Sequence, residues 1–377
     1  MKVPVSTPLF TSEVETNISA ALKDKAISGL YGQHLVEFEE GFAKFCNTKY
    51  AISCSSGTSA LHLAMAAHGI KKGDEVLVSS LTNMATFFAV LYLGAIPVPV
   101  DINLDTLNID YIDLKKKVSS KTKAIMVVHL FGHPVDMDPV SELAHKMNIP
   151  VFEDCAEAHG AEYKGRKVGG LGRAGCFSFF ANKILTTGEG GMVTTNDEEL
   201  AVKIKSLKSL AFGTHDKFQH TDIGFNYRMT NIQAAIGCEQ VKNAEFLINR
   251  RIEIANFYNH ELKEFSDFIL FPQEKSYAKN VYWMFHMVLN PKEKLYTLRE
   301  SILSDLHKVG IETRQGFVPF NLQNIFIKEK LTEPEDCPVA ASTSSASFYI
   351  PSGPDISQEE LEYVVSNFSL ILNNYIK

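Results

Sequence analysis

The most informative part of the chain is residues 176–197, which read CFSFFANKILTTGEGGMVTTND. Its aromatic and β-branched runs predict two short strands, at 177–180 and 192–195. Lys183 lies between these strands and precedes the glycine-rich run 188–191, where the missing side chains allow a ligand to approach the backbone closely. Burial and nearby cations lower the pKa of a lysine and supply the neutral amine that imine chemistry needs. The alternative is a lysine whose stem packs at a strand end while its ammonium reaches water.

The first two thirds of the chain alternate helix and strand patterns on both sides of this stretch. Apolar strands separated by helices of about ten residues indicate an α/β protein with a mainly parallel sheet that is covered on both faces. The predicted strands are residues 75–78, 96–100, 124–128 and 150–152, and the predicted helices are residues 59–65, 86–93, 111–117, 140–147, 198–210 and 231–241.

A long charged helix, residues 243–263, is expected to lead into a smaller C-terminal α/β domain. In that domain, residues 282–288 and 310–313 have strand patterns, and residues 358–374 have the pattern of a closing helix. The length of the chain also favours more than one domain. The predicted domains are an N-terminal arm with a large domain, residues 1–245, and a small domain, residues 246–377.

The overall composition excludes several classes of protein. With 377 residues and a net charge of −7, the chain has no basic excess with which to bind nucleic acid. Its six cysteines are scattered and contain no C-x-x-C pair, which is typical of reduced thiols in the cytoplasm. Residues 85–100 are the most apolar stretch but are too short to span a membrane, and the first residues lack the apolar core of a signal peptide. We therefore expect a soluble cytoplasmic protein without nucleic-acid or membrane partners.

Two further candidate groups lie where predicted strands end, which is where open α/β sheets bind ligands. Residues 54–59, CSSGTS, open a helix, so their backbone N–H groups and hydroxyls suit a phosphate. The alternative is a plain Ser or Thr helix cap. Asp154 follows the buried strand 150–152 and needs a partner to offset its burial. It could hold a metal, act as a base, pair with a cationic ring nitrogen, or cap the next turn.

Three other patterns are assigned no function. Residues 170–175 match G-x-G-x-x-G but precede a strand instead of joining a strand to a helix, so we interpret them as a loop. His129 and His133 have the spacing of a zinc pair, yet the residues between them predict a strand end and a loop. Cys155 has no paired base and is interpreted as a buried thiol. We expect no metal.

The remaining candidates fit one cofactor together. Gly57, Thr58 and Ser59 offer a phosphate cradle, Asp154 offers a buried anion, and Lys183 offers an amine. Pyridoxal 5′-phosphate requires this combination, because its phosphate needs a helix start, its ring nitrogen an anion and its aldehyde a lysine.

The same residues lie in motifs that resemble the DegT/DnrJ/StrS family of nucleotide-sugar aminotransferases, and its perosamine-synthase-like members most closely. The resemblance is strong from about residue 31 to about residue 237 and thinner beyond. It is carried by SSGTSALHLA, EDCAEAHGAEYKGRKVG, FSFFANKILTTGEGGMVTTND and GFNYRMTNIQAAIG. It implies the aspartate-aminotransferase fold (fold type I), pyridoxal phosphate as cofactor, and a homodimer.

The resemblance implies a role for each matching position. Lys183 matches the lysine that binds the cofactor covalently, Asp154 the partner of the ring nitrogen, and Glu157 a hydrogen-bonding residue near the phenolic oxygen. Ala156 matches a small residue packed against the ring. Asn226 matches a phosphate contact that reaches in from the neighbouring subunit, which implies that the homodimer shares its active sites. The other phosphate contacts match Gly57, Thr58 and Ser178.

The chain departs from the family pattern in three places. Asn83 stands where relatives usually have an aromatic residue, which would stack on the cofactor ring. Residues 312–321, ETRQGFVPFN, lack a proline after Arg314 and have Asn321 where a histidine is usual. Residues 28–40, SGLYGQHLVEFEE, lack a Trp-Ile-Ser pattern. We expect these segments to shape the sugar pocket.

The resemblance implies an aminotransferase that moves an amino group from L-glutamate to a nucleotide-linked keto-deoxy sugar. A 4-keto-6-deoxy sugar is one example, and surface polysaccharide or antigen biosynthesis is the expected context. A pyridoxal-phosphate-dependent sugar dehydratase is an alternative, although related deoxygenating enzymes have a histidine in place of the lysine. A non-catalytic ligand-binding or regulatory module on the same scaffold is the second alternative.

Overall fold

A seven-stranded sheet forms the centre of the computed structural model, which describes residues 1–213, 216–220 and 222–376. The strand order is β1-β9-β8-β5-β4-β2-β3. β9 is antiparallel to both of its neighbours, and the other pairs are parallel, which confirms the predicted mainly parallel sheet. The bounds are β1 Tyr50–Cys54, β2 Glu75–Ser79, β3 Ile96–Val100, β4 Thr122–Val128, β5 Val151–Asp154, β8 Ala174–Ser178 and β9 Gly191–Thr195.

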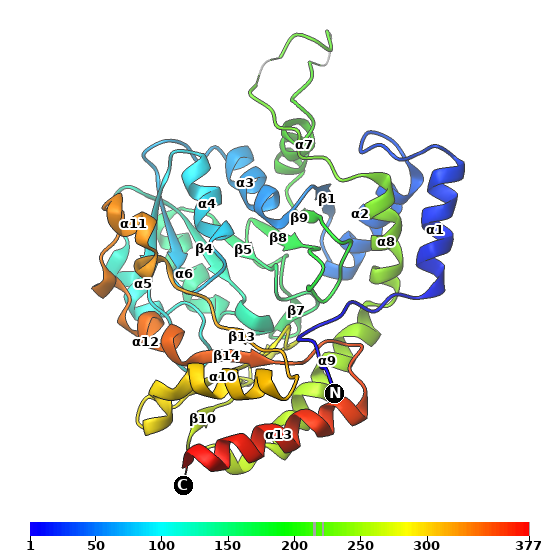
Figure 1. Ribbon diagram of the computed structural model, residues 1–377. Coiled ribbons are helices and arrows are strands. Elements are labelled where there is room, and N and C mark those ends of the chain that lie inside the picture. Colours follow the sequence, from blue (N-terminus) through cyan, green and yellow to red (C-terminus); the bar gives the residue numbers. More distant parts are fainter. Residues whose placement is uncertain (214–215, 221, 377) are drawn as a thin grey trace.

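Helices cover both faces of this sheet (Figure 1). Along β4, Ala124 and Met126 pack in the core beneath α3 and α4, whereas Ile125 and Val127 pack in the core beneath α5 and α6. Successive side chains of a strand point to opposite faces, so a strand that is buried on both sides is apolar throughout. The bounds are α3 Gly57–His68, α4 Ala85–Tyr92, α5 Tyr111–Lys117, α6 Met137–Met147, α7 Glu198–Leu207 and α8 Asn231–Lys242.

The N-terminal arm is mostly helical. Its two helices, α1 (Ser12–Lys23) and α2 (Gln33–Cys46), pack against α8. Ahead of them, Val3 is fully buried and pairs with Ile311, so the N-terminus lies beside the C-terminal lobe (Figure 1). The arm therefore contacts both parts of the chain.

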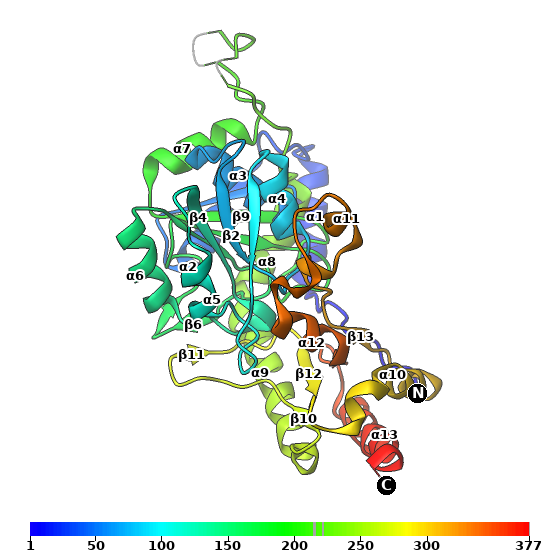
Figure 2. The same ribbon diagram turned by 90° about the vertical axis from the view of Figure 1, so that its left-hand side faces the viewer.

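The C-terminal lobe has a second sheet and its own core, and it lies below the large sheet in Figure 2. Its antiparallel strands have the order β10-β12-β14-β13. We propose that the boundary between the two domains lies near residue 245, at the start of α9. Among the residues that the structure describes, no helix has both the length and the apolar character needed to cross a bilayer. The bounds are α9 Ala244–Glu261, β10 Ile269–Leu270, β12 Phe285–Leu289, α10 Arg299–Lys308, β13 Arg314–Gln315, β14 Ser347–Ile350 and α13 Gln358–Ile376.

Two segments connect the lobes. The short strand β11 of the C-terminal part pairs with β6 of the large lobe, and β6 pairs with β7. Residues 320–340 also lie against the large lobe, where Phe320 stacks on Phe87 with the ring centroids 4.1 Å apart. The bounds are β6 Glu162–Tyr163, β7 Arg166–Lys167, β11 Ala278–Lys279, α11 Asn324–Lys328 and α12 Pro338–Ala346.

Three predicted strands differ clearly from the structure in their bounds, and the others differ by at most two residues at either end. The strand predicted at 177–180 is β8, which starts earlier because Ala174 already pairs with β5. The strand predicted from residue 282 begins at Phe285, because the φ of Tyr282 is 46°, outside the extended region. In the strand predicted at 310–313, only Ile311 pairs, and β13 follows it. In these segments, an apolar run correctly indicates that the residues are buried, but it does not show which of them adopt an extended backbone.

Candidate active site

A cavity of about 350 Å³ lies at the carboxyl ends of β4, β5 and β8. Aromatic side chains of the C-terminal lobe, Trp283, Phe317 and Tyr349, complete its wall. The structure brings all the predicted site residues together here except Ser59 and Asn226: Gly57, Thr58, Asp154, Ala156, Glu157, Ser178 and Lys183. A second cavity, of about 310 Å³, lies between the lobes and contains none of them.

The helix start at α3 forms one end of the main cavity. Ser56 and Ser59 cap the helix reciprocally, with a distance of 3.1 Å from Ser59 N to Ser56 Oγ. Ser59 therefore serves as part of the cap, whereas Gly57 and Thr58 line the cavity. A Cβ on Gly57 would lie 2.7 Å from the Cβ of Ser178, so only glycine fits. The N–H groups of a first helical turn have no partner within the helix, and they attract an anion.

Asp154 lies in the floor of the cavity at the end of β5 and is 5% exposed. Its Oδ2 accepts a hydrogen bond from Thr86 Oγ1 at 2.8 Å, and its Oδ1 accepts one from Ala156 N at 3.1 Å. Burial raises the pKa of Asp154 above the ordinary value of an aspartate, despite both bonds. A buried carboxylate in this state is stabilised by a cationic partner.

Lys183 lines the same cavity from a loop that joins β8 to β9, and its side chain is 10% exposed. Its Nζ is 3.8 Å from Glu157 Oε1 and 3.9 Å from the centre of the Trp283 ring. Burial lowers the pKa of Lys183, although the carboxylates of Glu157 and Asp154 oppose that shift. The amine therefore gives up its proton more readily than the amine of an exposed lysine does.

Glu157 is a second buried acid beside this amine. Burial raises its pKa to about 7, while Lys183 and a hydrogen bond from Phe131 N to Oε2, at 2.9 Å, act in the opposite direction. Both pKa values are thus shifted in the direction that favours the neutral forms of Glu157 and Lys183, even though Glu157 Oε1 and Lys183 Nζ are close enough for an ion pair. For a contact of 3.8 Å in a buried site, desolvation is the larger effect.

Glu153, next to Asp154 in sequence, points away from the cavity and has a structural role. Its oxygens accept hydrogen bonds from Gly169 N at 2.8 Å, Leu171 N at 2.9 Å and Gly172 N at 2.7 Å. Residues 170–173 of the G-x-G-x-x-G match are thus a loop held by a buried carboxylate, as predicted, whereas residues 174–175 already belong to β8.

The two histidines that have the spacing of a zinc pair also make hydrogen bonds within the protein. His129 donates from Nε2 to Glu153 at 3.1 Å and accepts at Nδ1 from Val135 N at 3.0 Å. His133 contacts the carbonyl of Pro134 through Nδ1 at 2.8 Å. Cys155 is fully buried, and burial raises the pKa of its thiol well above the ordinary range, as expected of an unreactive thiol.

Asn226 lies outside the cavity of its own chain. It is exposed, and its backbone pairs with Ser209 in an isolated bridge. Asn83 does line the cavity, where its Oδ1 accepts a hydrogen bond from Ala85 N at 3.0 Å. The arm residues 28–40 border a different hollow, which also contains Arg228.

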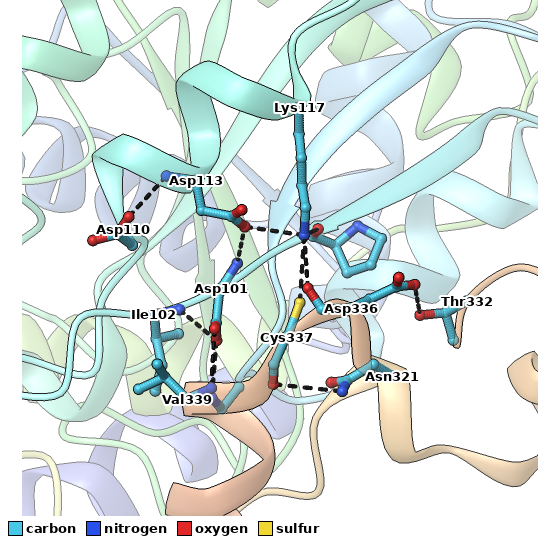
Figure 3. A network of polar contacts seen from close by, with 12 residues as sticks. Asp101, Ile102, Asp110, Asp113, Lys117, Asn321, Thr332, Asp336, Cys337 and Val339 are labelled. Carbon is cyan, nitrogen blue, oxygen red and sulfur yellow. Dashed lines mark hydrogen bonds and ion pairs between the residues drawn. The ribbon is translucent and has the colours of Figure 1, made fainter. Parts of the chain in front are cut away.

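Asn321 does not line the cavity and lies instead in a buried network that attaches the C-terminal segment to the large lobe (Figure 3). Its Nδ2 donates to the carbonyl of Pro334 at 2.6 Å. In the same network, Asp101 accepts from Val339 N at 3.0 Å and Ala340 N at 2.9 Å at the start of α12. Lys117 donates to the carbonyl of Asp336 at 3.0 Å. Of the predicted pocket segment 312–321, Phe317 lines the cavity directly.

Asp101→Ala should lower the free energy of unfolding by about 1–3 kcal/mol, because two N–H groups of α12 lose their acceptor inside the protein. Asp105→Ala is the matched control. It removes an exposed carboxylate paired with Lys275 and should cost at most about 1 kcal/mol. Urea unfolding of both variants measures the difference, and equal losses would contradict the role of Asp101 as an anchor for α12.

Two residues that contact the predicted catalytic groups were not predicted from the sequence. Thr86 supports Asp154 from α4, and Trp283 contacts Lys183 from the C-terminal lobe. A polar residue within the apolar run 85–93 was a signal for Thr86, and Trp283 is the single tryptophan of the chain. Neither signal indicates which residue it contacts, because the contacts depend on how the lobes pack.

The residues of the cavity fit pyridoxal phosphate. The glycine at the start of α3 leaves room beside Ser178 for a phosphate. Burial disfavours the charged form of Asp154, and a protonated ring nitrogen would stabilise that form. Lys183 supplies an amine whose pKa is lowered by burial. The cavity thus offers one group for each reactive part of the cofactor.

Comparison with known proteins supports the same assignment. The chain is 38% identical over 371 residues to a GDP-perosamine synthase of Caulobacter vibrioides, with 98% of each chain covered. It is 37% identical over 355 residues to a dTDP-3-amino-3,6-dideoxy-alpha-D-galactopyranose transaminase of Aneurinibacillus thermoaerophilus, covering 93% of this chain and 94% of the relative. Its fold matches the putative sugar aminotransferase Spr1654 of Streptococcus pneumoniae in its PLP form, with a TM-score of 0.92, 25% identity and 99% of both chains covered.

The family comparison extends over nearly the whole chain. The family model of the DegT/DnrJ/EryC1/StrS aminotransferases matches residues 9–369, which include every residue of the cavity described above. The resemblance seen in the sequence motifs is thereby confirmed, as are the fold and the cofactor expected from it. The chain belongs to the DegT/DnrJ/EryC1/StrS aminotransferase family and is a pyridoxal-phosphate-dependent aminotransferase.

Proposed function

We propose that the enzyme transfers an amino group from L-glutamate to a nucleotide-linked keto-deoxy sugar, such as a 4-keto-6-deoxy sugar, for surface polysaccharide or antigen biosynthesis. The observation that carries the proposal is the buried amine of Lys183, which lines one cavity together with Asp154. Relatives named GDP-perosamine synthase and dTDP-amino-sugar transaminase support the sugar substrate.

Each residue of the cavity has one task in this proposal. Bound pyridoxal phosphate supplies an aldehyde that condenses with amines and a ring that withdraws electrons. Lys183 Nζ takes the proton from the α-carbon of the amino donor and returns it on the acceptor side. Asp154 keeps the ring nitrogen protonated, and Glu157 binds near the phenolic oxygen. The phosphate is held by Gly57, Thr58 and Ser178, and Ala156 packs against the ring.

The presence of Lys183 favours transamination over dehydration of the sugar. Dehydration removes a hydroxyl group and leaves no nitrogen in the sugar, whereas transamination replaces the carbonyl oxygen of the sugar with an amino group. Transfer of the amine needs a base that takes the proton from the α-carbon of the donor and an acid that later delivers a proton to the former carbonyl carbon of the sugar, and Lys183 can serve as both. The two reactions therefore give different products from the same sugar.

The experiment that tests the proposal is a substrate panel. The holoenzyme is incubated with ¹⁵N-labelled L-glutamate and, in turn, with GDP-, UDP- and dTDP-linked keto sugars, and the products are analysed by mass spectrometry. We expect the label in the amino group of at least one nucleotide sugar. Loss of a hydroxyl group without gain of the label would identify a dehydratase, and no reaction with any member would contradict the sugar assignment.

We further propose that the enzyme is a cytoplasmic homodimer in which each active site is shared. All six cysteines are free and buried, as is typical of a reducing compartment. Asn226 is exposed and lies outside its own cavity, which leaves it available to the phosphate of the partner subunit. Arg228, two residues further on, is the nearby charge in that loop.

Mixing the variants Lys183→Ala and Asn226→Asp, each inactive alone, should restore about a quarter of the wild-type activity. Asp at position 226 repels the phosphate of the partner site. In a mixed dimer, one site then carries both changes and the other is intact. Half of the dimers are mixed after free exchange of subunits, and turnover of the mixture measures the intact sites.

The matched control is a mixture of Lys183→Ala with Asp154→Asn. These residues line one cavity of one chain, so both sites of the mixed dimer stay damaged and no activity returns. If native mass spectrometry detects Lys183→Ala/Asn226→Asp heterodimers that remain inactive, Asn226 does not act across the interface.

A further inference from the structure

Trp283 makes the closest aromatic contact with the amine of Lys183. The Nζ atom lies 3.9 Å from the centre of the indole ring, and Trp283 is 2% exposed. An ammonium over the face of a desolvated indole is held by the quadrupole of the ring. The indole Nε1 also donates to the carbonyl of Asn182 at 2.8 Å. The indole of Trp283 thus contacts the amine of Lys183 through its face, and its N–H fixes Asn182, the residue before Lys183.

The backbone of Trp283 is fixed on both sides. Its N–H donates to the carbonyl of Phe131 at 3.0 Å, and its carbonyl accepts from Arg251 Nη1 of α9 at 2.5 Å. Arg251 is 2% exposed and also donates to the carbonyl of Ser352 at 3.2 Å. The position of the indole is therefore set by the large lobe, by α9 and by the C-terminal lobe together.

The junction with Phe131 is conformationally strained. Phe131 has a φ of 51° and Tyr282 a φ of 46°, both in the left-handed region that non-glycine residues rarely adopt. Between them, Gly132 has a φ of 98°, and a Cβ there would lie 2.7 Å from Tyr282 N. Strained conformations of this kind persist where the surrounding structure imposes them, and they are enriched at functional sites.

The same junction also fixes the acid beside Lys183. Phe131 N donates to Glu157 Oε2 at 2.9 Å, while Phe131 O accepts from Trp283 N. The backbone of Phe131 therefore helps to position both the carboxylate of Glu157 and the indole of Trp283, which contact the amine of Lys183. A shift of the C-terminal lobe at this junction would move both groups relative to Lys183.

We propose that Trp283 is a positioning residue for Lys183, holding its amine over the cavity and making that position depend on the seating of the C-terminal lobe. The inference rests on the proposed role of Lys183 in amine transfer. It adds a residue of the C-terminal lobe that acts through the lysine.

The first test uses the fluorescence of Trp283 in the full-length protein after removal of the cofactor. Because the chain has a single tryptophan, the emission reports the surroundings of Trp283 alone. Lys183→Met should change the intensity or the maximum of the emission, whereas Lys117→Met, a lysine of the distant network, should leave both unchanged. Identical spectra of the wild type and Lys183→Met would overturn the contact, whatever the enzyme's substrate.

The second test compares two replacements of Trp283 in the holoenzyme. Trp283→Phe keeps an aromatic face but loses the N–H to Asn182, and Trp283→Leu loses both. The rate at which L-glutamate reacts should fall about 10-fold in Trp283→Leu and by less than about 3-fold in Trp283→Phe. Thermal unfolding of both variants serves as the control. Equal rates in the two variants would overturn the positioning role, and a failed sugar assay would leave both tests interpretable.

Discussion

Lys183→Ala should lower kcat by more than about 10³-fold. Among the described residues that line the cavity, Lys183 is the only one with an amine, so no other group can take over its proton transfer. Burial lowers the pKa of this amine, and the methyl group of alanine offers no base at all. Steady-state turnover with L-glutamate and a keto sugar that the wild-type enzyme accepts measures the loss.

Lys164→Ala is the control for this variant. Lys164 is exposed and pairs with Asp138 on the surface, so its removal should leave kcat within about 2-fold of the wild type. Unchanged turnover in Lys183→Ala would show that the amine does not take part in the reaction. A loss of folded protein would show up in circular dichroism and would be separated from a loss of chemistry.

Asp154→Asn should lower kcat by about 10²–10³-fold while the protein stays folded. The amide carries no charge, so the ring nitrogen loses the anion that keeps it protonated. Stability should change little, because two effects oppose each other. The amide loses an acceptor for one of the bonds from Thr86 and Ala156, but the variant also removes a charge that burial disfavours.

The removal of the buried charge is expected to stabilise the protein, and this direction follows from the pKa of Asp154. Burial raises the pKa of Asp154 in the folded protein above its unfolded value, so the charged form costs stability as pH rises through the unfolded pKa. Asp154→Asn removes this cost at neutral pH. Turnover and thermal unfolding at pH 7 measure the two effects separately.

Glu153→Gln is the matched comparison, since its carboxylate is buried one residue earlier on the same strand. It should lower the free energy of unfolding by about 2–3 kcal/mol, because an amide cannot accept all the bonds from Gly169, Leu171 and Gly172. Its kcat should stay close to the wild-type value once the protein is folded. If Asp154→Asn kept near-normal turnover, or if both variants behaved alike, Asp154 would have a structural role only.

A residue of the candidate site could be predicted from the sequence where its role depends only on its neighbours in the chain. Gly57 follows a strand and starts a helix, and Asp154 ends a buried strand, so both tasks are visible within a few residues. Lys183 was found in the same way, from the strands that flank it. Local patterns thus located the parts of the cavity that one sheet edge provides.

The parts that depend on packing between distant segments could not be predicted. Thr86 lies 68 residues from Asp154, and only the fold brings its hydroxyl to that carboxylate. Trp283 reaches Lys183 from the other lobe. The strand bounds near Tyr282 were missed because a left-handed residue interrupts an apolar run, and apolar character alone does not encode φ. The different roles of Glu153 and Asp154 likewise depend on the face of β5 from which each side chain projects.

The two half-reactions, followed by absorbance, test the central claim most directly. L-glutamate alone should remove the visible band of the holoenzyme, with release of 2-oxoglutarate, and a nucleotide-linked keto sugar added afterwards should restore it. Restoration by the sugar, together with an equivalent amount of amino sugar, is the result expected of a sugar aminotransferase. A band that L-glutamate and other amino acids leave unchanged, or that no nucleotide-linked keto sugar restores, would contradict the assignment.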